Sequence, residues 1–435
     1  MRDIIIALIV FGSLPFVLKR PSVGIVLWCW LSYMNPHRMT YGFAYNFPFA
    51  AIVAGAVILA VLFSKDSRRI PWTPLSIVWL VFILWMCFTT LFAMVPDSAH
   101  EAWSRAMKIQ LMAFLTIAIM GTRERLTALV WIIVLSIGFF GVKGGIFTIL
   151  TGGEDMVFGP PDTFIEGNNS IALALVMILP LMRYLQMNSH RRLVRYALGV
   201  AMALSVLAAL ASYSRGAFLA VTAMGMFLVW KSRKKKALIL AALIIVPIML
   251  SFMPEKWFER LETIQSYEQD KSTLGRFNAW EFAYNIAKER PLVGGGYDVF
   301  DPNLFRRYAP EPENFHDAHS IYFEVLGEHG FIGLILFLTI GFLSLKTCQW
   351  TIRETRNRDD LRWAGDLASM VQVAIIGYAV GGAFLGLAYF DLYYHLVTMA
   401  LLTRILVEKA LAEDRVPALK PEDTPVSQGF SGGAG

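Results

Sequence analysis

The stretch from residue 170 to residue 218, "SIALALVMILPLMRYLQMNSHRRLVRYALGVAMALSVLAALASYSRGAF", decides the fold class. Two long apolar runs flank a short cluster of basic residues, and a third apolar run begins after Arg215. A helix that crosses a bilayer needs about 20 predominantly apolar residues, and these runs approach that length. The pattern predicts consecutive membrane-spanning helices, joined by a basic loop on one side and a tight turn on the other.

The rest of the chain repeats this pattern. Hydrophobic residues make up 56% of the 435 residues and charged residues only 17%, which is more apolar than an ordinary soluble protein. We therefore predict an all-α polytopic membrane protein with about 12 transmembrane helices. The first two segments are short, so the parity of the crossings stays open. The candidate segments are 3–17, 22–35, 47–64, 74–94, 107–121, 126–150, 170–187, 193–212, 214–231, 237–253, 319–347, 366–388 and 392–407.

Basic residues occur in short clusters between the apolar runs, so the net charge of +6 does not indicate a nucleic-acid partner. If the helices alternate in direction, all clusters fall on one side, which the positive-inside rule assigns to the cytoplasm. The periplasmic side of a bacterial inner membrane then receives 36–46, 95–106, 151–168, the turn near 212–215 and the long polar segment 254–318. The clusters are Lys65/Arg68/Arg69, Arg123/Arg125, Arg191/Arg192/Arg195, "KSRKKK" at 231–236 and Arg353/Arg356/Arg358/Arg362.

These features divide the chain into four parts. We expect an N-terminal transmembrane bundle over 1–253, a periplasmic loop over 254–318, C-terminal transmembrane helices over 319–407, and a disordered cytoplasmic tail over 408–435. Within the loop, residues 275–291 are predicted to form an amphipathic helix on the outer membrane surface, as a substrate platform or a purely structural helix. Its expected apolar face is Phe277, Trp280, Tyr284 and Ala287.

Two arginines on the predicted periplasmic side are candidates for binding an anion. Arg215 lies at a membrane boundary, where an arginine is costly unless it is hydrated or paired. A lone arginine on this side opposes the positive-inside bias, and its fork of donors suits a phosphate or diphosphate. A snorkelling interface arginine is the alternative. Arg276 gains weight because a diphosphate carries enough charge for two guanidinium groups.

His316, His319 and His329 lie at the front of the apolar run that begins near residue 319. Asp317 is expected to N-cap the helix, which puts His319 in the first turn, where the helix dipole lowers its pKa. A neutral imidazole accepts a proton, so His319 is a candidate general base. A hydrogen-bonded interface histidine is the alternative. Tyr322 continues the same helix face, which we expect to point into the bundle.

Glycine and asparagine mark further positions. Gly330 and Gly333 are expected to allow close helix packing. The segment "PLVGGGYDVF" at 291–300 lacks the ending of a nucleotide P-loop, so we interpret it as a tight turn with close backbone approach. Asn168 and Asn169 open a predicted helix, where an N-cap role is favoured and sugar binding is the alternative.

A metal site is not predicted. His316 and His319 have a spacing that suits a pair of ligands, but a catalytic zinc site uses three protein ligands and no third is indicated. The outer loops lack the clustered carboxylates that Mg²⁺ requires. Cys29, Cys87 and Cys348 show neither a disulfide nor a zinc-site spacing.

Several stretches together resemble the O-antigen ligase and polymerase superfamily. The most specific, "HSIYFEVLGEHGFIGL", matches the family's His, aromatic, then Glu-x-Gly-x-x-Gly arrangement, although Ser320 stands where the family usually has Asn. The chain's opening segment, "RPSVGIVLWCWLSYMNPHRMTYGFAYNFPFA", resembles a subgroup described as O-glycosylation ligases. The other matching stretches are "NNSIALALVMILP", "SYSRGAFLA" and "GRFNAW" with "RPLVGGGYDVF".

The resemblance implies a GT-C-like glycosyltransferase architecture and an O-antigen ligase activity. The enzyme would transfer a glycan from undecaprenyl diphosphate to a lipid A–core sugar in the periplasm, with inversion and without a metal or other cofactor. The alternatives are a glycan polymerase or a protein O-glycosylation ligase. A transporter of lipid-linked glycans would instead be expected to show internal repeats and discontinuous helices.

The resemblance also implies roles for individual residues. His319 would be the general base that activates the acceptor hydroxyl. Arg215 and Arg276 would hold the diphosphate and stabilise it as the leaving group. The remaining candidates for substrate contacts are Asn169, His316 and Tyr322.

Overall fold

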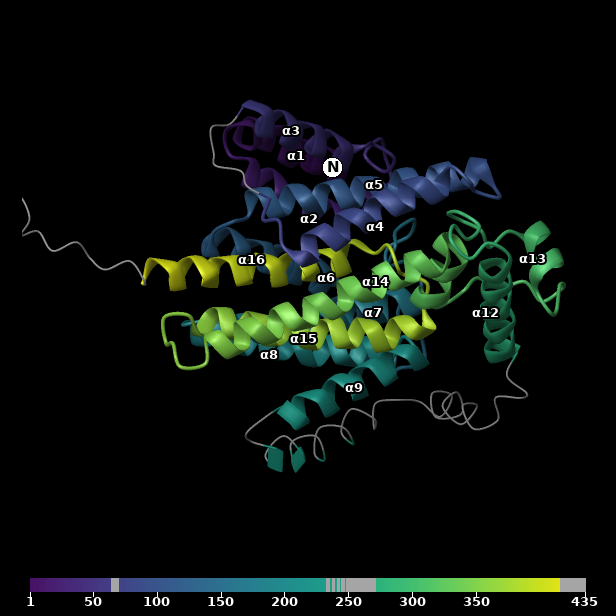
Figure 1. The fold of residues 1–435 in the computed structure, drawn as a ribbon. Coiled ribbons are helices and arrows are strands. Elements are labelled where there is room, and N and C mark those ends of the chain that lie inside the picture. The colour runs from purple at the N-terminus through teal and green to yellow at the C-terminus, as the bar shows by residue number, and fades with distance from the viewer. Residues whose placement is uncertain are drawn as a thin grey trace, which may run out of the picture.

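The computed structural model describes residues 1–63, 70–231 and 271–414, together with 235–236, 239–240, 243 and 247. Over these residues the chain forms helices joined by turns and loops, without a β-strand (Figure 1). The helices are α1 (Arg2–Lys19), α2 (Pro21–Met34), η1 (Pro36–Met39), α3 (Phe49–Phe63), α4 (Pro74–Thr90), α5 (Pro96–Ile119), α6 (Arg123–Leu150), α7 (Asn168–Asn188), α8 (Arg192–Leu210), α9 (Arg215–Lys231), α12 (Lys271–Glu289), α13 (Pro302–Tyr308), α14 (Ile321–Glu354), α15 (Arg362–Gly381), η3 (Gly382–Phe384) and α16 (Asp391–Glu413).

Twelve of the thirteen predicted apolar segments coincide with helices, and the remaining one, 237–253, lies largely outside the described residues. Two boundaries are wrong. Residues 95–106 are expected to form an outer loop, but from Pro96 onward they form the first part of α5. Proline is favoured at the first position of a helix, and the polar residues that follow tolerate a helical backbone. The helix α16 continues to Glu413, so residues 408–413 are helical and not part of a tail.

Five described helices are long and apolar enough to cross a membrane: α6, α7, α8, α14, and α15 extended through η3. Three shorter apolar helices, α2, α3 and α4, accompany them. The structure therefore supports an all-helical polytopic membrane protein. The expected total of about 12 crossings stays a prediction.

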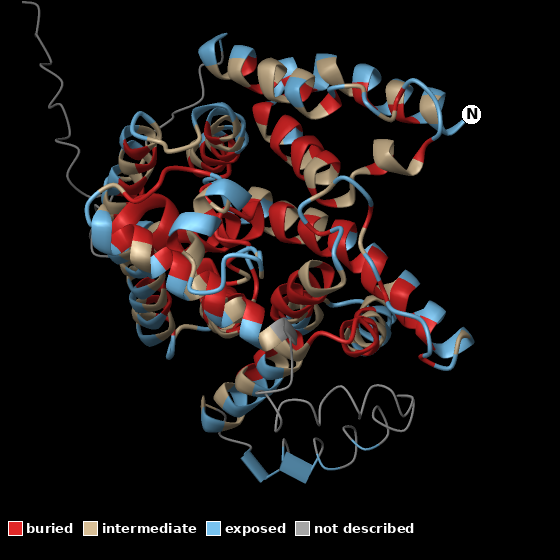
Figure 2. Cartoon of the chain, turned by 90° about the vertical axis from the view of Figure 1, so that its right-hand side faces the viewer, coloured by how far each residue is buried: buried red, intermediate tan, exposed pale blue. Residues whose placement is uncertain are grey.

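The long helices run roughly parallel in Figure 1, whereas α12 and α13 lie together at one end of the bundle. The first half of α16 lies at the centre of the bundle, because every residue from Asp391 to Thr403 is buried. A helix that is apolar on all sides must be surrounded by other elements. Figure 2, viewed from the end with α12 and α13, shows the buried residues turned toward the middle of the bundle.

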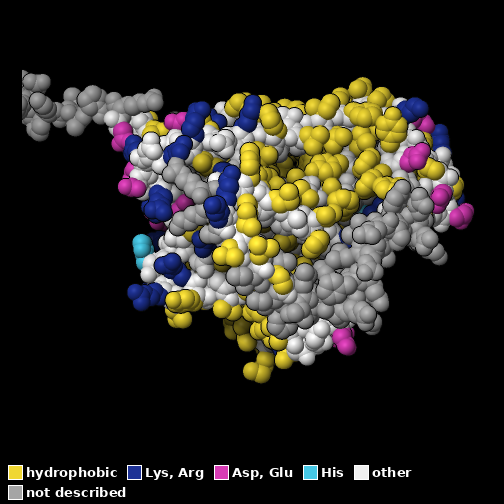
Figure 3. Space-filling view, turned by 90° about the horizontal axis from the view of Figure 1, so that it is seen from below, with side chains coloured by type: hydrophobic (Ala, Val, Ile, Leu, Met, Phe, Trp, Pro, Cys, Tyr) yellow, Lys and Arg dark blue, Asp and Glu magenta, His cyan; other side chains and the backbone are white. Residues whose placement is uncertain are grey.

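Basic residues gather at the opposite end, which we call the basic end. Arg123, Arg195 and Arg362 come from three separate predicted clusters, yet they line one cavity of 620 Å³ there. Figure 3 shows Lys and Arg at this end of the visible face and hydrophobic side chains over its middle. The cluster Lys65/Arg68/Arg69 lies outside the described residues, as do residues 232–234 of the cluster at 231–236.

The predicted amphipathic helix exists as α12, but it buries a different face. Phe277 and Tyr284 are 45% and 48% exposed, whereas Ala279, Phe282 and Ile286 are fully buried. This second face packs against α13 and α14, which explains why it is preferred to the expected one. Of the expected face, Ala287 is buried and Trp280 is partly buried.

Candidate active site

His319 precedes α14 and does not lie in its first turn. The helix begins at Ile321 with Ser320 as its N-cap, and no side chain bonds to the helix start, so the expected cap by Asp317 is wrong. His319 has a φ of +41°, in the left-handed region that non-glycine residues seldom adopt. The chain therefore turns sharply at His319 before it enters the helix.

The helix α12 holds the segment that leads to His319. The amide of Asn278 donates to the carbonyls of Glu311 at 2.8 Å and Asn314 at 3.0 Å, and its oxygen accepts from the Glu311 N–H at 2.9 Å. The indole of Trp280 donates to the Ala318 carbonyl at 2.7 Å. These bonds fix the backbone at three points between Glu311 and Ala318, just before His319. Contacts with α12, and not helix capping, therefore set the position of His319.

His316 and Arg276, two other candidate residues, lie near His319. A Cβ at Gly275 would collide with the ring of His316, so this imidazole packs directly on the backbone of α12. Burial lowers the pKa of His319, and the nearby Arg276 guanidinium lowers that pKa further, against an opposing effect of Asp317. The imidazole is therefore neutral at pH 7 and able to accept a proton.

Arg215 begins α9, directly after the tight turn that the sequence predicts. In this turn Tyr213 has a φ of +57°, and its hydroxyl donates to the Gly153 carbonyl at 2.8 Å. The Asn168 amide donates to the Ser212 carbonyl at 2.8 Å. The start of α7 and the loop after α6 thus brace the backbone that presents Arg215.

The segment between α15 and α16 contacts both the Arg215 and the His319 regions. A Cβ at Gly216, next to Arg215, would lie 3.4 Å from the Cβ of Phe384. A Cβ at Gly386 would lie 3.8 Å from the backbone nitrogen of His319. In Figure 1 the ends of α9, α14 and α15 meet at the end of the bundle that carries α12. Arg215, Arg276 and His319 therefore belong to one end of the molecule.

Asn169 and Tyr322 are less clearly placed for substrate binding. The N-cap of α7 is Gly167, without a side-chain cap bond, so the expected capping role of Asn168 or Asn169 is wrong. Asn168 is instead drawn to the α8–α9 turn, and Asn169 is half-buried in the first turn of α7. The Tyr322 hydroxyl donates to the Ala379 carbonyl at 2.7 Å, which ties α14 to α15. Their substrate contacts stay predictions.

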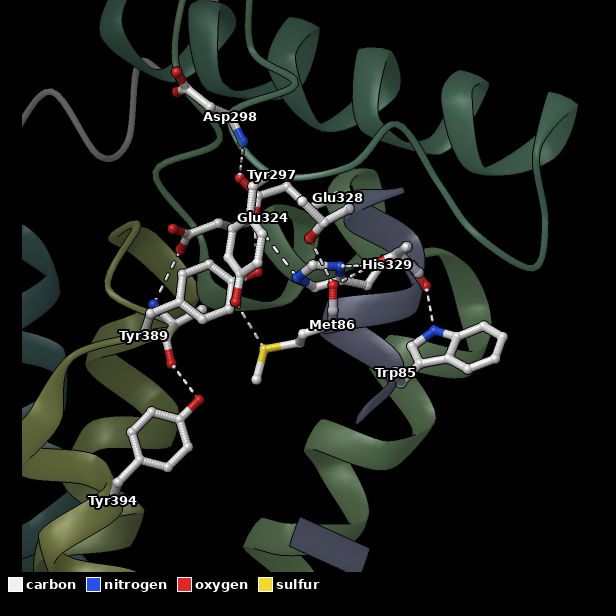
Figure 4. Close-up of polar contacts among 12 residues, drawn as sticks. Trp85, Met86, Tyr297, Asp298, Glu324, Glu328, His329, Tyr389 and Tyr394 are labelled. Carbon is white, nitrogen blue, oxygen red and sulfur yellow. Dashed lines mark hydrogen bonds and ion pairs between the residues drawn. The ribbon is translucent and has the colours of Figure 1, made fainter. Parts of the chain in front are cut away.

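Two glutamates of α14 connect the loops around this site, and we did not assign them a role from the sequence. Glu328 accepts from the Asp298 N–H at 2.8 Å and from the Tyr389 hydroxyl at 2.5 Å, and Glu324 accepts from the Ala388 N–H at 3.0 Å (Figure 4). Acidic residues inside an apolar helix are expensive unless they are bonded. Their spacing of four residues within an otherwise apolar run is the sequence feature that could have identified them.

Gly330 interrupts α14 and does not serve as a helix-packing glycine. Its φ of +68° and ψ of −171° are non-helical, and the Phe331 N–H donates to the Pro291 carbonyl at 3.0 Å. The Gly295 N–H donates to the Gly327 carbonyl at 2.8 Å. The 291–300 segment thus docks on the interrupted helix, which confirms the predicted tight turn with close backbone approach.

His329, next to this interruption, is fully buried. Its Nδ1 lies 2.7 Å from the Thr89 hydroxyl, and its backbone carbonyl accepts from the Trp85 indole at 3.1 Å. Figure 4 shows the imidazole between Glu328 and the helix α4 that carries Trp85 and Met86. His329 therefore joins α14 to α4 in the interior.

Among the residues that the structure describes, no three His, Cys, Asp or Glu side chains are grouped closely enough to hold a metal ion. His316 and His319 lack a third partner of this kind within that part of the chain. A metal-independent reaction stays a prediction.

Two regions of the chain match known protein families. Residues 200–338 match the family described as O-Antigen ligase, and this match includes Arg215, Arg276 and His319. Residues 1–190 match a family of unknown function (DUF5935), and they include Asn169. A search of curated proteins returns no match. The match over residues 200–338 supports a place for this chain in the O-antigen ligase superfamily.

Proposed function

We propose that the protein is an O-antigen ligase of the bacterial inner membrane. Its substrates are a glycan on undecaprenyl diphosphate and a sugar hydroxyl of lipid A–core, and its site faces the periplasm. The family match over residues 200–338 supports glycosyl transfer. The separation of the basic end from the end with α12 supports the orientation, because cytoplasmic loops carry the excess of Lys and Arg.

The observation that carries the proposal is the environment of His319. Its imidazole is held at a sharp backbone turn, its pKa is lowered by burial and by Arg276, and it stands at the same end of the molecule as Arg215. Transfer of a glycan from a diphosphate is helped by a base that is neutral at pH 7, which takes the proton of the acceptor. It is also helped by cations such as two guanidinium groups, which stabilise the leaving diphosphate.

In the proposed reaction, a ring nitrogen of His319 takes the proton from the acceptor hydroxyl. The acceptor oxygen forms a bond to the anomeric carbon of the donor sugar while the bond from that carbon to the diphosphate oxygen breaks. Arg215 and Arg276 stabilise the negative charge on the departing undecaprenyl diphosphate. Attack from the side opposite the leaving group inverts the anomeric centre. A positioned base contributes roughly 10²–10⁴-fold to such a rate.

The acceptor distinguishes the ligase from its alternatives. Purified full-length protein is supplied with undecaprenyl diphosphate-linked glycan and with lipid A–core, and each lipid is then analysed by mass spectrometry. We expect glycan on lipid A–core and undecaprenyl diphosphate in equal amounts. The same preparation of His319→Ala is expected to form both products at least about 100-fold more slowly.

Elongation of the carrier-linked glycan without labelling of lipid A–core would contradict the ligase and identify a polymerase. Labelling of a protein acceptor alone would identify a protein O-glycosylation ligase. His100→Ala is a suitable control, because His100 is an exposed histidine of α5 outside the site, and it is expected to keep activity.

A further inference from the structure

We propose that a cavity at the basic end binds the phosphate of an anionic phospholipid from the surrounding leaflet. The cavity has a volume of 430 Å³ and lies between the start of α4, the last turns of α14 and the second half of α16. It shares no residue with the candidate active site, which lies at the end with α12. Lipid binding in this cavity is therefore independent of the proposed reaction.

Three cationic side chains line this cavity, Lys346, Arg353 and Arg404, and none of its lining residues is acidic. The guanidinium of Arg404 lies 4.7 Å from the centre of the Trp350 ring, and its Nε bonds to Glu408 at 2.7 Å. Within the described chain, no acceptor bonds to its two terminal nitrogens. Arg404 is thus held in place with donors left for a ligand, and a guanidinium fork suits a phosphate.

The other two cations differ in how far they are already neutralised. Arg353 bonds to Glu354 through Nε at 3.1 Å and through a terminal nitrogen at 3.0 Å, whereas Arg404 pairs with Glu408 through Nε alone. The Lys346 ammonium lies 4.6 Å from the centre of the Phe342 ring, and no carboxylate among the described residues pairs with it. Lys346 and Arg404 are therefore the two cations on which binding depends most.

The exposed face of α14 changes character at the level of the cavity. Residues three or four apart share one face of a helix, and the exposed residues on this face are apolar first and polar or cationic afterwards. An apolar surface suits acyl chains, and a cation beyond it suits the headgroup level of a bilayer. In order along the helix they are Ile335, Leu338, Phe342, Lys346, Gln349 and Arg353.

The neighbouring helix α4 extends this apolar surface. It packs against α14 and exposes Ile77, Val81 and Leu84 on one face. Leu75 and Leu343 continue the apolar wall into the cavity itself. An apolar wall beside the cations favours a phosphate that carries acyl chains over a free phosphate ion.

The 620 Å³ cavity at the same end shows what a less suitable site looks like. Its arginines alternate with Asp359, Asp360 and Asp366, which also line it. These carboxylates compensate the arginines and repel an anion. In contrast to this cavity, the one beside Trp350 combines cations, an absence of lining carboxylates and an apolar wall.

The test uses full-length protein in detergent micelles from which native lipid has been removed. Binding of phosphatidylglycerol, of phosphatidylcholine with the same acyl chains, and of inorganic phosphate is measured by native mass spectrometry. The variant Lys346→Gln/Arg404→Gln is compared with Lys409→Gln/Arg356→Gln, which removes the same charge from exposed residues outside the cavity. We expect phosphatidylglycerol to bind best, and the cavity variant to bind it at least tenfold more weakly, since each surface cation contributes about 1 kcal/mol.

The control variant is expected to bind phosphatidylglycerol as the wild type does, and millimolar inorganic phosphate is expected not to displace it. Equal losses in both double variants, or no loss in the cavity variant, would overturn the proposal. Displacement by inorganic phosphate would overturn the lipid as its source. If the double variant does not fold, Lys346→Gln alone is expected to weaken binding about fivefold, and unchanged binding would count against the site.

Discussion

His319 and His329 belong to the same short motif, yet they lie in opposite environments. His319 stands at a sharp turn before α14, beside Arg276, in a loop that α12 holds in place. His329 is fully buried beside a helix interruption and bonds to Thr89 of α4. One half of the motif therefore presents the proposed base in a loop, whereas the other half joins α14 to α4 and to the 291–300 segment in the interior.

Gly330→Ala would break the buried half of the motif and should have the largest effect on stability. The backbone of Gly330 lies where a side chain is strained, and a Cβ would come within 2.5 Å of the Leu292 carbonyl. We expect a loss of about 3 kcal/mol or more, from strain and collision together. Thermal unfolding in detergent, followed by tryptophan fluorescence, measures it.

Gly55→Ala is the matched control, because its added Cβ meets nothing within 4 Å in α3. It is expected to leave stability unchanged or raise it by about 0.5–1 kcal/mol. A Gly330→Ala protein that melts like the wild type would show that the interruption does not hold the 291–300 segment.

Glu328→Gln would weaken the same half of the motif more mildly. An amide keeps one acceptor oxygen, so either the Asp298 N–H or the Tyr389 hydroxyl would face a donor. We expect destabilisation of about 1–3 kcal/mol. Glu281→Gln, at an exposed position of α12, should change the melting temperature little, and equal melting of the two variants would argue against the brace.

Arg215→Lys tests the reactive side. The lysine keeps the charge but loses the two-pronged donor, so transfer should fall about tenfold, which corresponds to the loss of roughly one charge-assisted hydrogen bond. The rate of release of undecaprenyl diphosphate measures the effect. Arg306→Lys on α13, an exposed arginine bonded to Asn303, should transfer normally. Wild-type rates for Arg215→Lys would indicate a membrane anchor only.

The smallest expected effect is on the pH dependence of glycan transfer. Because burial and Arg276 lower the pKa of His319, kcat/KM should rise with pH through a pKa below the ordinary value of about 6.5 and be level at neutral pH. Arg276→Gln removes a cation that disfavours the protonated imidazole, so its acidic limb should move to higher pH. Asp317→Asn should move the limb to lower pH. Shifts of the same sign in both variants would contradict the assignment.

The helices could be predicted from the sequence because a bilayer demands long apolar segments. Twelve of the expected segments became helices for this reason. The sharp turn at Tyr213 and the close approach of 291–300 also followed from their residues. The family motif located His319 without any knowledge of its backbone.

The local geometry could not be predicted in the same way, because contacts between distant segments decide it. Asp317 was a plausible cap, but the bonds from Asn278 and Trp280 of α12 hold the loop in another conformation. Gly330 had the spacing of a packing glycine, and only the docking of 291–300 makes it an interruption. The buried face of α12 depends on α13 and α14, which a helical-face pattern does not include.

In the proposed reaction His319, and not the buried His329, accepts the proton. The most direct measurement is the single-turnover rate of glycan transfer to lipid A–core by purified His319→Ala, in a preparation whose melting temperature matches the wild type. We predict a rate at least about 100-fold below the wild type, as expected for loss of a general base. A folded His319→Ala protein that transfers glycan within a few-fold of the wild-type rate would contradict the account.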